Sequence, residues 1–220
     1  MTVAFDEAGT VAAPAVDRGG FRRLAVRLLW LTVIWNIAEG FVAVGSGVAA
    51  GSVALVGFGL DSFIEVTAAL VLVWRLGVPE HDERVEARET AARRVVGITF
   101  LALAAYIAVQ SVYTVAAGGT PEASGVGLGL AVASLIAMPV LGLAKLRNAR
   151  RLGSRALVSE SAETLVCTYL SVTLFIGLAA NWTLGWWWAD VGAALAMAPW
   201  IVREGLEGLR GDACGGEEES

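Results

Sequence analysis

The chain has 220 residues, of which 56% are hydrophobic and 17% charged, and its formal net charge is -5. Its mean hydropathy of +0.66 is too apolar for an ordinary soluble domain, so we expect lipid to be its main surroundings. The acidic residues lie largely in the tails and in residues 79–94, while the basic residues flank apolar segments. This distribution does not suggest a nucleic-acid-binding protein.

Apolar segments follow one another along the chain, each close to the length of about 20 residues that a membrane-spanning helix needs. They are residues 24–46, 52–75, 95–117, 125–144, 156–180 and 183–202. We therefore predict an all-α, polytopic membrane protein, a bundle of six transmembrane helices over residues 24–208. Residues 1–23 are the expected cytoplasmic N-terminal tail, and residues 209–220 a short acidic cytoplasmic tail. The first apolar segment is too long for a cleaved signal sequence, so we expect it to be retained.

The basic residues give the orientation, because cytoplasmic loops hold an excess of Lys and Arg close to the ends of the spans. The first, third and fifth connections contain no Lys or Arg. All sixteen basic residues therefore fall on one side of the predicted membrane. We expect an integral protein of the plasma (inner) membrane, with both termini in the cytoplasm and the lipid bilayer as its main partner.

Two acidic residues interrupt the second apolar segment in "GFGLDSFIEV", residues 57–66. Each ionised acid costs about 2.5 to 3.5 kcal/mol at the centre of a spanning helix, so two of them need a reason. Asp61 and Glu65 are four residues apart and project from one helical face. Two carboxylates at that spacing require a cation or protons between them. The alternative is that both are protonated, or bonded to polar groups such as Asn36, and tie the bundle together.

The fifth apolar segment repeats this arrangement in "SESAETLVCTYLSV". Glu160, Glu163 and Cys167 follow at spacings of three and four, and hence lie on one helical face. Asp61 and Glu65, with Glu163 and Cys167, would supply four donors from two helices. Carboxylate and thiolate donors in that number suit a tetrahedral divalent ion of borderline-soft character. Cys167 has an equally favoured alternative as a small apolar filler.

Further polar residues in the apolar segments leave alternatives open. Asn36 and Glu39 could line the path of an ion, support the metal ligands, hold a proton or bond to a neighbouring helix. Glu160 either attracts the cation on its way in or pairs with Arg155 at the start of its helix, and the ion pair is slightly favoured. Asp190 follows interfacial tryptophans, so capping or anchoring is favoured over coordination.

The remaining reactive residues suggest no enzymatic site. Cys167 and Cys214 are expected to be free thiols, because they lie too far apart for a disulfide. His81 lies in a charged loop, where solvation is favoured over metal binding. No nucleophile with a plausible base and no HExxH or GxSxG motif occurs. We expect a protein that is not an enzyme and has no organic cofactor.

The residues that carry the acids resemble a known family, the cation diffusion facilitators or cation efflux proteins. "AGSVALVGFGLDSFIEV" is similar to the family's second helix, "GSxALxAdaxxSxxD", and places Asp61 and Glu65 on its DxxxD pair. "SESAETLVCTYLSV" is similar to the fifth helix, "ADAxHxxxDxxxSV", with Glu163 at the His position and Cys167 at the Asp position. "GWWWADVGAALAMAPWIVREGL" resembles the sixth helix, so the resemblance covers about residues 20–208.

This resemblance implies an exporter of divalent metal ions, most often zinc, that exchanges the ion for protons and commonly forms a homodimer. Because the chain ends soon after the sixth segment, we expect a short member without the family's C-terminal cytoplasmic domain. Cys167 favours Zn2+ or Cd2+ as the transported ion, whereas Glu163 favours Mn2+ or Fe2+, and zinc is preferred from the family's habit. The alternative is a non-transporting, membrane-embedded protein of the same fold that binds metal or a partner.

Overall fold

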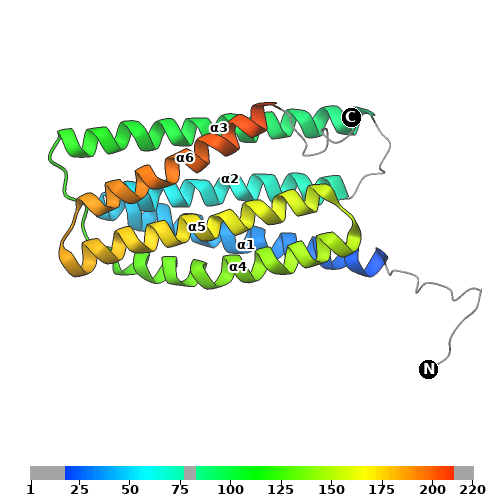
Figure 1. Ribbon diagram of the computed structural model, residues 1–220, viewed down its shortest axis with the longest axis horizontal. Coiled ribbons are helices and arrows are strands. Elements are labelled where there is room, and N and C mark those ends of the chain that lie inside the picture. The colour runs from blue at the N-terminus through cyan, green and yellow to red at the C-terminus, as the bar shows by residue number, and fades with distance from the viewer. Residues whose placement is uncertain (1–17, 77–82, 211–220) are drawn as a thin grey trace, which may run out of the picture.

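The computed structural model describes residues 18–76 and 83–210. These ranges form helices without strands: α1 (Arg18–Ala50), α2 (Val53–Leu76), α3 (Glu83–Ala116), α4 (Gly125–Leu152), α5 (Arg155–Leu184) and α6 (Trp188–Arg210). All six helices run along one bundle, as Figure 1 shows. The predicted all-α, six-helix fold is confirmed. The expectations for His81, Cys214 and most of both tails fall on residues outside the described ranges.

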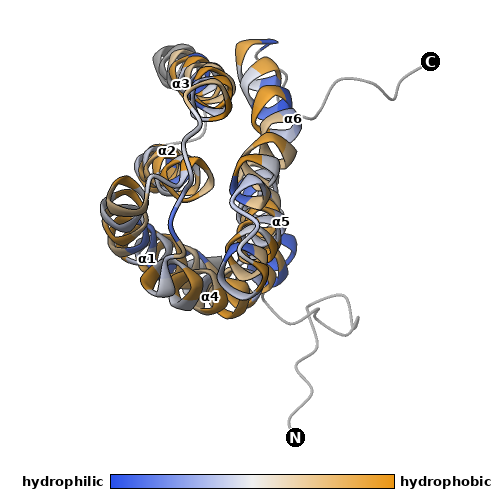
Figure 2. Ribbon diagram, turned by 90° about the vertical axis from the view of Figure 1, so that its left-hand side faces the viewer, coloured by the Kyte–Doolittle hydropathy of each residue, from blue (hydrophilic) through white to orange (hydrophobic). Residues whose placement is uncertain are grey.

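The helices form a closed ring when viewed along the bundle (Figure 2). Helix α1 packs against α2 and α4, α3 packs against α2 and α6, and α5 packs against α4 and α6. Helix α2 also contacts α5 and α6 across the ring. The two helices that carry the predicted metal ligands, α2 and α5, are therefore neighbours inside the bundle.

The helices extend beyond most of the predicted apolar segments. Helix α1 begins at Arg18 rather than at residue 24, and α4 continues to Leu152 rather than ending at residue 144. Helix α6 begins at Trp188, five residues later than the predicted start at 183. Hydropathy locates the part of a helix that lies in lipid, but the backbone hydrogen bonds continue through flanking Arg and Lys, which are good helix formers.

The surface of the bundle is suited to lipid. Among the described residues, five helices are long and apolar enough to cross a membrane, and α6 falls outside this group. Charged residues on α6, which are Asp190, Arg203, Glu204, Glu207 and Arg210, account for the difference. Large apolar side chains such as Phe41, Val109 and Ile136 are exposed on the outside of the bundle. The protein is therefore an integral membrane protein.

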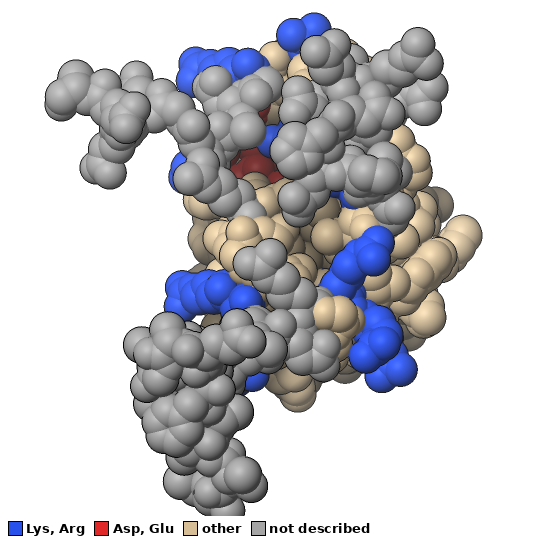
Figure 3. Space-filling model, turned by 90° about the vertical axis from the view of Figure 1, so that its right-hand side faces the viewer, with Lys and Arg blue, Asp and Glu red and all other residues tan. Residues whose placement is uncertain are grey.

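One end of the bundle collects basic residues. Helices α1, α3 and α5 begin there and α2, α4 and α6 end there (Figure 1). Figure 3 views this end directly and shows Lys and Arg side chains gathered around it. We call it the basic end. Its composition agrees with the one-sided distribution of Lys and Arg in the sequence.

Helices α3 and α6 approach closely because glycines face each other. A Cβ atom at Gly97 would lie 2.8 Å from the carbonyl oxygen of Gly205, and one at Gly208 would lie 2.8 Å from Cα of Gly97. Small residues permit such contacts between membrane helices, whereas any larger side chain would separate them. Glu204, the neighbour of Gly205, lies on α6 beside this contact.

The turn between α4 and α5 sets these helices side by side. Gly153 adopts a left-handed φ of 69° and ends α4, and its N–H donates to the carbonyl oxygen of Ala149. Ser154 caps α5, since its side chain accepts a hydrogen bond from the Leu157 N–H. A left-handed glycine followed by a serine N-cap is a favourable combination for reversing the chain between two helices. It brings Lys145 on α4 next to Glu160 on α5.

Candidate functional site

A layer of polar side chains crosses the middle of the bundle between two apolar clusters. On α2, Leu55 and Phe58 belong to one cluster and Ala69 and Leu72 to the other. The residues between these two clusters are Asn36 and Glu39 on α1; Asp61, Ser62 and Glu65 on α2; Lys145 on α4; and Glu160, Thr164 and Cys167 on α5. We call this set the polar layer. Apolar packing above and below it limits access of water, so each polar group needs a partner there.

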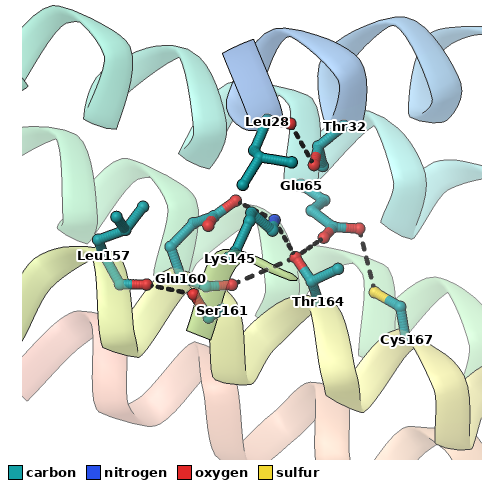
Figure 4. A network of polar contacts seen from close by, with 9 residues as sticks. All are labelled: Leu28, Thr32, Glu65, Lys145, Leu157, Glu160, Ser161, Thr164 and Cys167. Atoms are coloured by element: carbon teal, nitrogen blue, oxygen red, sulfur yellow. Dashed lines mark hydrogen bonds and ion pairs between the residues drawn. The ribbon is translucent and has the colours of Figure 1, made fainter. Parts of the chain in front are cut away.

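Three of the four predicted metal ligands lie close together in this layer. Asp61 and Glu65 are 5% exposed and Cys167 is 7% exposed. The Cys167 Sγ is 3.1 Å from Oε2 of Glu65 and 3.7 Å from Oδ2 of Asp61. Figure 4 shows the thiol of α5 directed at the Glu65 carboxylate of α2. Asp61 and Glu65 are four residues apart and share one face of α2, and Cys167 lies on the face of α5 that is directed at them.

Glu163, the fourth predicted ligand, is half-buried and lines the same small cavity as the other three. This cavity has a volume of about 20 Å³, room for roughly one water-sized particle. Among the described residues, no group of three or more His, Cys, Asp or Glu side chains already has an arrangement that could hold a metal ion. The four residues thus share a cavity without a closed ligand set, and the metal site stays a prediction.

A larger cavity of about 150 Å³ adjoins the small one. Glu163 and Glu204 line both cavities. The larger cavity is also lined by Glu160 and Glu207, and by Arg75 and Arg93 near the basic end. Figure 3 shows acidic surface recessed among basic side chains at that end. Carboxylates therefore line cavities from near the basic end to the polar layer.

Glu160 forms an ion pair within the polar layer with a lysine of the neighbouring helix α4. Its Oε1 lies 2.6 Å from Nζ of Lys145, which is fully buried on α4. The sequence suggested Arg155 as the partner of Glu160, but the side chain of Arg155 lies outside the part of the chain that the structure describes, so that pairing stays a prediction. Helix α4 packs directly against α5, and this packing brings Lys145 beside Glu160.

The polar residues of α1 form a second small group. Ser62 on α2 donates a hydrogen bond to Oε2 of Glu39, at 3.1 Å. Asn36 is fully buried, and neither its side-chain oxygen nor its nitrogen has a hydrogen-bond partner among the described residues. The alternative in which Asn36 bonds to Asp61 and Glu65 is therefore wrong for this structure. Glu39 does bond to a neighbouring helix, which is one of the roles considered for it.

Asp190 caps a helix, as the sequence favoured, but the capped helix is α2. Its carboxylate accepts hydrogen bonds from Oγ of Ser52 at 2.5 Å and from the Val53 N–H at 2.8 Å. The first backbone N–H groups of a helix lack partners within the helix, and a carboxylate satisfies them and the helix dipole together. Asp190 thus ties the start of α6 to the start of α2, away from the predicted metal ligands.

Sequence reasoning missed Lys145, Thr164 and Glu204. Lys145 lies just after an apolar segment and resembled an ordinary flanking charge. Thr164 had a usable signal, because it lies four residues after Glu160 and three before Cys167, on the same face. Glu204 lies among other charged residues at the end of α6, so its position in the sequence carries no distinct signal. It lines both cavities in the folded bundle, where α6 packs against α3.

The fold and the polar layer define a class of protein: a polytopic membrane protein that holds ionisable groups inside a helical bundle, as ion and proton carriers do. Residues 29–211, most of the chain, match the cation efflux transmembrane domain. The chain belongs to the cation efflux family, as the sequence resemblance implied. Members of this family transport divalent metal cations.

One similar protein is transmembrane protein 163 of Xenopus laevis. It is 24% identical over 146 residues, which cover 66% of this chain and 52% of that protein. The chain thus spans about half the length of this curated relative. The similarity places both among membrane proteins.

Proposed function

We propose that the protein transports a divalent metal cation, preferably zinc, in exchange for protons, and that Asp61, Glu65, Glu163 and Cys167 bind the ion between α2 and α5. The observation that supports this most strongly is the position of the Cys167 sulfur beside both carboxylates of α2. A thiol and two acids at one point of a membrane bundle are costly to bury, and a bound cation would offset that cost.

The separations between these donors favour a small tetrahedral ion. Zinc binds sulfur at about 2.3 Å and carboxylate oxygen at about 2.0 to 2.2 Å, which places the two ligand atoms about 3.5 Å apart in a tetrahedral site. The observed distances from Cys167 Sγ, 3.1 Å to Glu65 and 3.7 Å to Asp61, lie on either side of that value. Side-chain shifts would be needed to close the set around zinc, with Glu163 as the proposed fourth ligand.

Exchange for protons follows from the chemistry of these ligands. A thiol must lose its proton to bind a metal ion, and a carboxylic acid must do the same. In a bundle with little water, carboxyl groups close to one another hold protons more readily than they do in solution. Metal binding therefore releases protons, and protons displace the metal. A membrane gradient of protons can drive the ion against its own gradient.

The larger cavity supports a route for the ion from the basic end. Its carboxylates, including Glu163 and Glu204, also border the small cavity and attract cations locally. We place the basic end in the cytoplasm, with the protein in the plasma (inner) membrane, because Lys and Arg concentrate on that side. The ion then enters from the cytoplasm and leaves on the other side. We also propose a homodimer, the assembly that the family resemblance implies.

The test uses purified protein in liposomes that contain a fluorescent metal reporter, with an imposed pH gradient. Zinc, cadmium, manganese and iron(II) are compared for the wild type and for Asp61→Asn. Glu122→Gln is the matched control, because it also neutralises an acid but lies exposed in the turn before α4. We expect zinc flux driven by the gradient in the wild type and the control, and none in Asp61→Asn.

The other results have definite meanings. Metal binding without flux, in folded protein, would favour the non-transporting alternative of the same fold. Equal flux in Asp61→Asn and wild type would place the transported ion elsewhere. Faster flux of manganese than of zinc would overturn the proposed preference and give more weight to the carboxylates than to Cys167.

A further inference from the structure

Lys145 is a fully buried cation inside a bundle that is proposed to carry cations. It is 0% exposed, on α4, and belongs to neither of the helices that carry the proposed ligands. A buried ammonium group is costly unless a charge and hydrogen bonds compensate it. Lys145 has both: Oε1 of Glu160 lies 2.6 Å from its Nζ, and Oγ1 of Thr164 lies 2.5 Å away.

The hydrogen bonds run in one direction from Lys145 to the proposed ligands. An ammonium group only donates, so the Thr164 oxygen accepts from Lys145 and its own proton remains available. Two acceptors lie within reach of that proton, and Oε1 of Glu65 at 2.7 Å is closer than the backbone carbonyl oxygen of Glu160 at 3.2 Å, so Thr164 donates to Glu65. Glu65 is thereby held by one oxygen, and its other oxygen, Oε2, faces Cys167 at 3.1 Å. Figure 4 shows this sequence of contacts from α4 through α5 to α2.

The charges in this network balance locally. Lys145 and Glu160 form a pair with no net charge, beside the proposed ion site. Glu160 also lines the larger cavity, and its Oε2 has no hydrogen-bond partner among the described residues. If the ammonium charge were absent, Glu160 would add an uncompensated negative charge next to the site and would strengthen its attraction for a divalent cation.

We propose that Lys145 is a positioning residue that orients Glu65 through Thr164, and that its fixed charge keeps metal binding weak enough for release. This inference rests on the proposed function of the α2–α5 site. The two contributions are separable in the chain. Thr164 orients Glu65 and has no charge of its own, whereas Lys145 and Glu160 together set the local charge balance.

Variants can separate these contributions by equilibrium zinc binding, measured by competition with a chromophoric chelator, together with flux in liposomes. Lys145→Gln keeps a donor but leaves Glu160 unbalanced, so zinc should bind about tenfold more tightly or more and maximal flux should fall. Lys145→Gln with Glu160→Gln restores neutrality and should return the affinity close to that of the wild type. Thr164→Val should weaken zinc binding about tenfold or more, as loss of a group that orients a ligand typically does.

The double variant and Thr164→Val preserve net charge balance, so they keep the inference testable if Lys145→Gln folds poorly. Asp61→Asn is measured beside them. If zinc binds to the wild type and needs Asp61, but wild-type affinity persists in the Lys145→Gln and Thr164→Val variants, the role of Lys145 is refuted and the ion site stands. If zinc binding does not need Asp61, or the wild type binds no zinc, both proposals are overturned.

Discussion

At the level of single residues, the molecule combines donors of different hardness at one place. Asp61 and Glu65 supply carboxylate oxygens from α2, and Cys167 supplies sulfur from α5. Oxygen donors favour manganese and iron(II), whereas thiolate favours zinc and cadmium. The preference of the site among metals should therefore depend on Cys167 more than on either acid.

Replacing Cys167 by Ser keeps the size of the side chain and removes the soft donor. We expect the ratio of cadmium to manganese affinity to fall about tenfold or more, because oxygen replaces sulfur in the ligand set. Competition binding with both ions on purified protein measures this ratio. Cys214→Ser is the matched control, since it removes the other cysteine of the chain. An unchanged ratio would make Cys167 an apolar filler.

Residue chemistry alone predicted the four proposed ligands, but it did not predict the side chains that form hydrogen bonds with them. The acids were recognisable because a carboxylate in an apolar helix is costly and therefore conspicuous. Lys145 was not, because a lysine after an apolar segment usually extends to the surface. Its burial depends on how α4 and α5 pack, which is a property of the folded bundle.

At the level of helices, the start of α2 depends on a side chain from another helix. Asp190 accepts hydrogen bonds from Ser52 and from the Val53 N–H. Asp190→Ala should lower the free energy of unfolding by about 1 to 2 kcal/mol, the usual cost of losing a helix cap. Asp61 lies eight residues into α2, about 12 Å along the helix. Zinc affinity should therefore change little.

Thermal unfolding in detergent and zinc competition on the same sample measure both effects. The exposed Glu122→Gln variant is the control for loss of an acid outside the bundle. A large loss of zinc affinity in folded Asp190→Ala would show that the cap and the ion site are not independent.

The crossing of α3 and α6 depends on glycine. Gly97→Ala would place a Cβ 2.8 Å from the carbonyl oxygen of Gly205, so the helices must separate and Glu204 must move with α6. We expect lower thermal stability and slower metal flux. Gly192→Ala is the matched control on α6, because its Cβ would meet nothing within 4 Å. That variant should be unchanged or slightly more stable, since Ala favours helix over Gly by about 1 kcal/mol.

Equal stability and flux in the Gly97→Ala and Gly192→Ala variants would contradict a role for the close contact. The sequence contains small residues that allow helices to pack closely, but it does not show which helices they join. The pairing of α3 with α6 arises from the whole ring of helices. For the same reason, sequence could not place Glu204 beside the predicted ligands.

At the level of the whole molecule, the number and order of the helices were predictable because each apolar segment must satisfy its own backbone in lipid. The residues at which the helices begin and end were less predictable, since α1 and α4 continue into the basic segments that flank them. The one-sided charge pattern also carries a prediction of orientation. With the basic end in the cytoplasm, the C-terminal tail after α6 should lie there as well.

An impermeant thiol reagent tests this orientation. Cys214 should react in inside-out membrane vesicles and stay unlabelled in right-side-out vesicles, whereas Cys167 should be protected in both because it is buried. Cys214→Ser vesicles give the background. Labelling of Cys214 in right-side-out vesicles alone would reverse the proposed orientation and, with it, the direction of transport.

The proposed proton exchange predicts how the whole protein responds to pH. Bound protons occupy the carboxylates and thiol that the metal needs, so zinc affinity should fall as pH is lowered and rise as pH is raised. Zinc release should accompany uptake of protons. Titration of zinc binding at several pH values, with a pH indicator in weakly buffered protein, measures both. Zinc binding that is independent of pH would contradict exchange at this site.

The ligands of the bound ion test the central claim most directly. X-ray absorption at the zinc edge, on protein with Cys214→Ser and one equivalent of zinc, reports the atoms around the ion. The account predicts one sulfur at about 2.3 Å together with oxygens at about 2.0 to 2.2 Å, and loss of the sulfur signal on Cys167→Ser. A spectrum with oxygen or nitrogen ligands alone, or a sulfur signal that survives Cys167→Ser, would place the ion outside the site between α2 and α5.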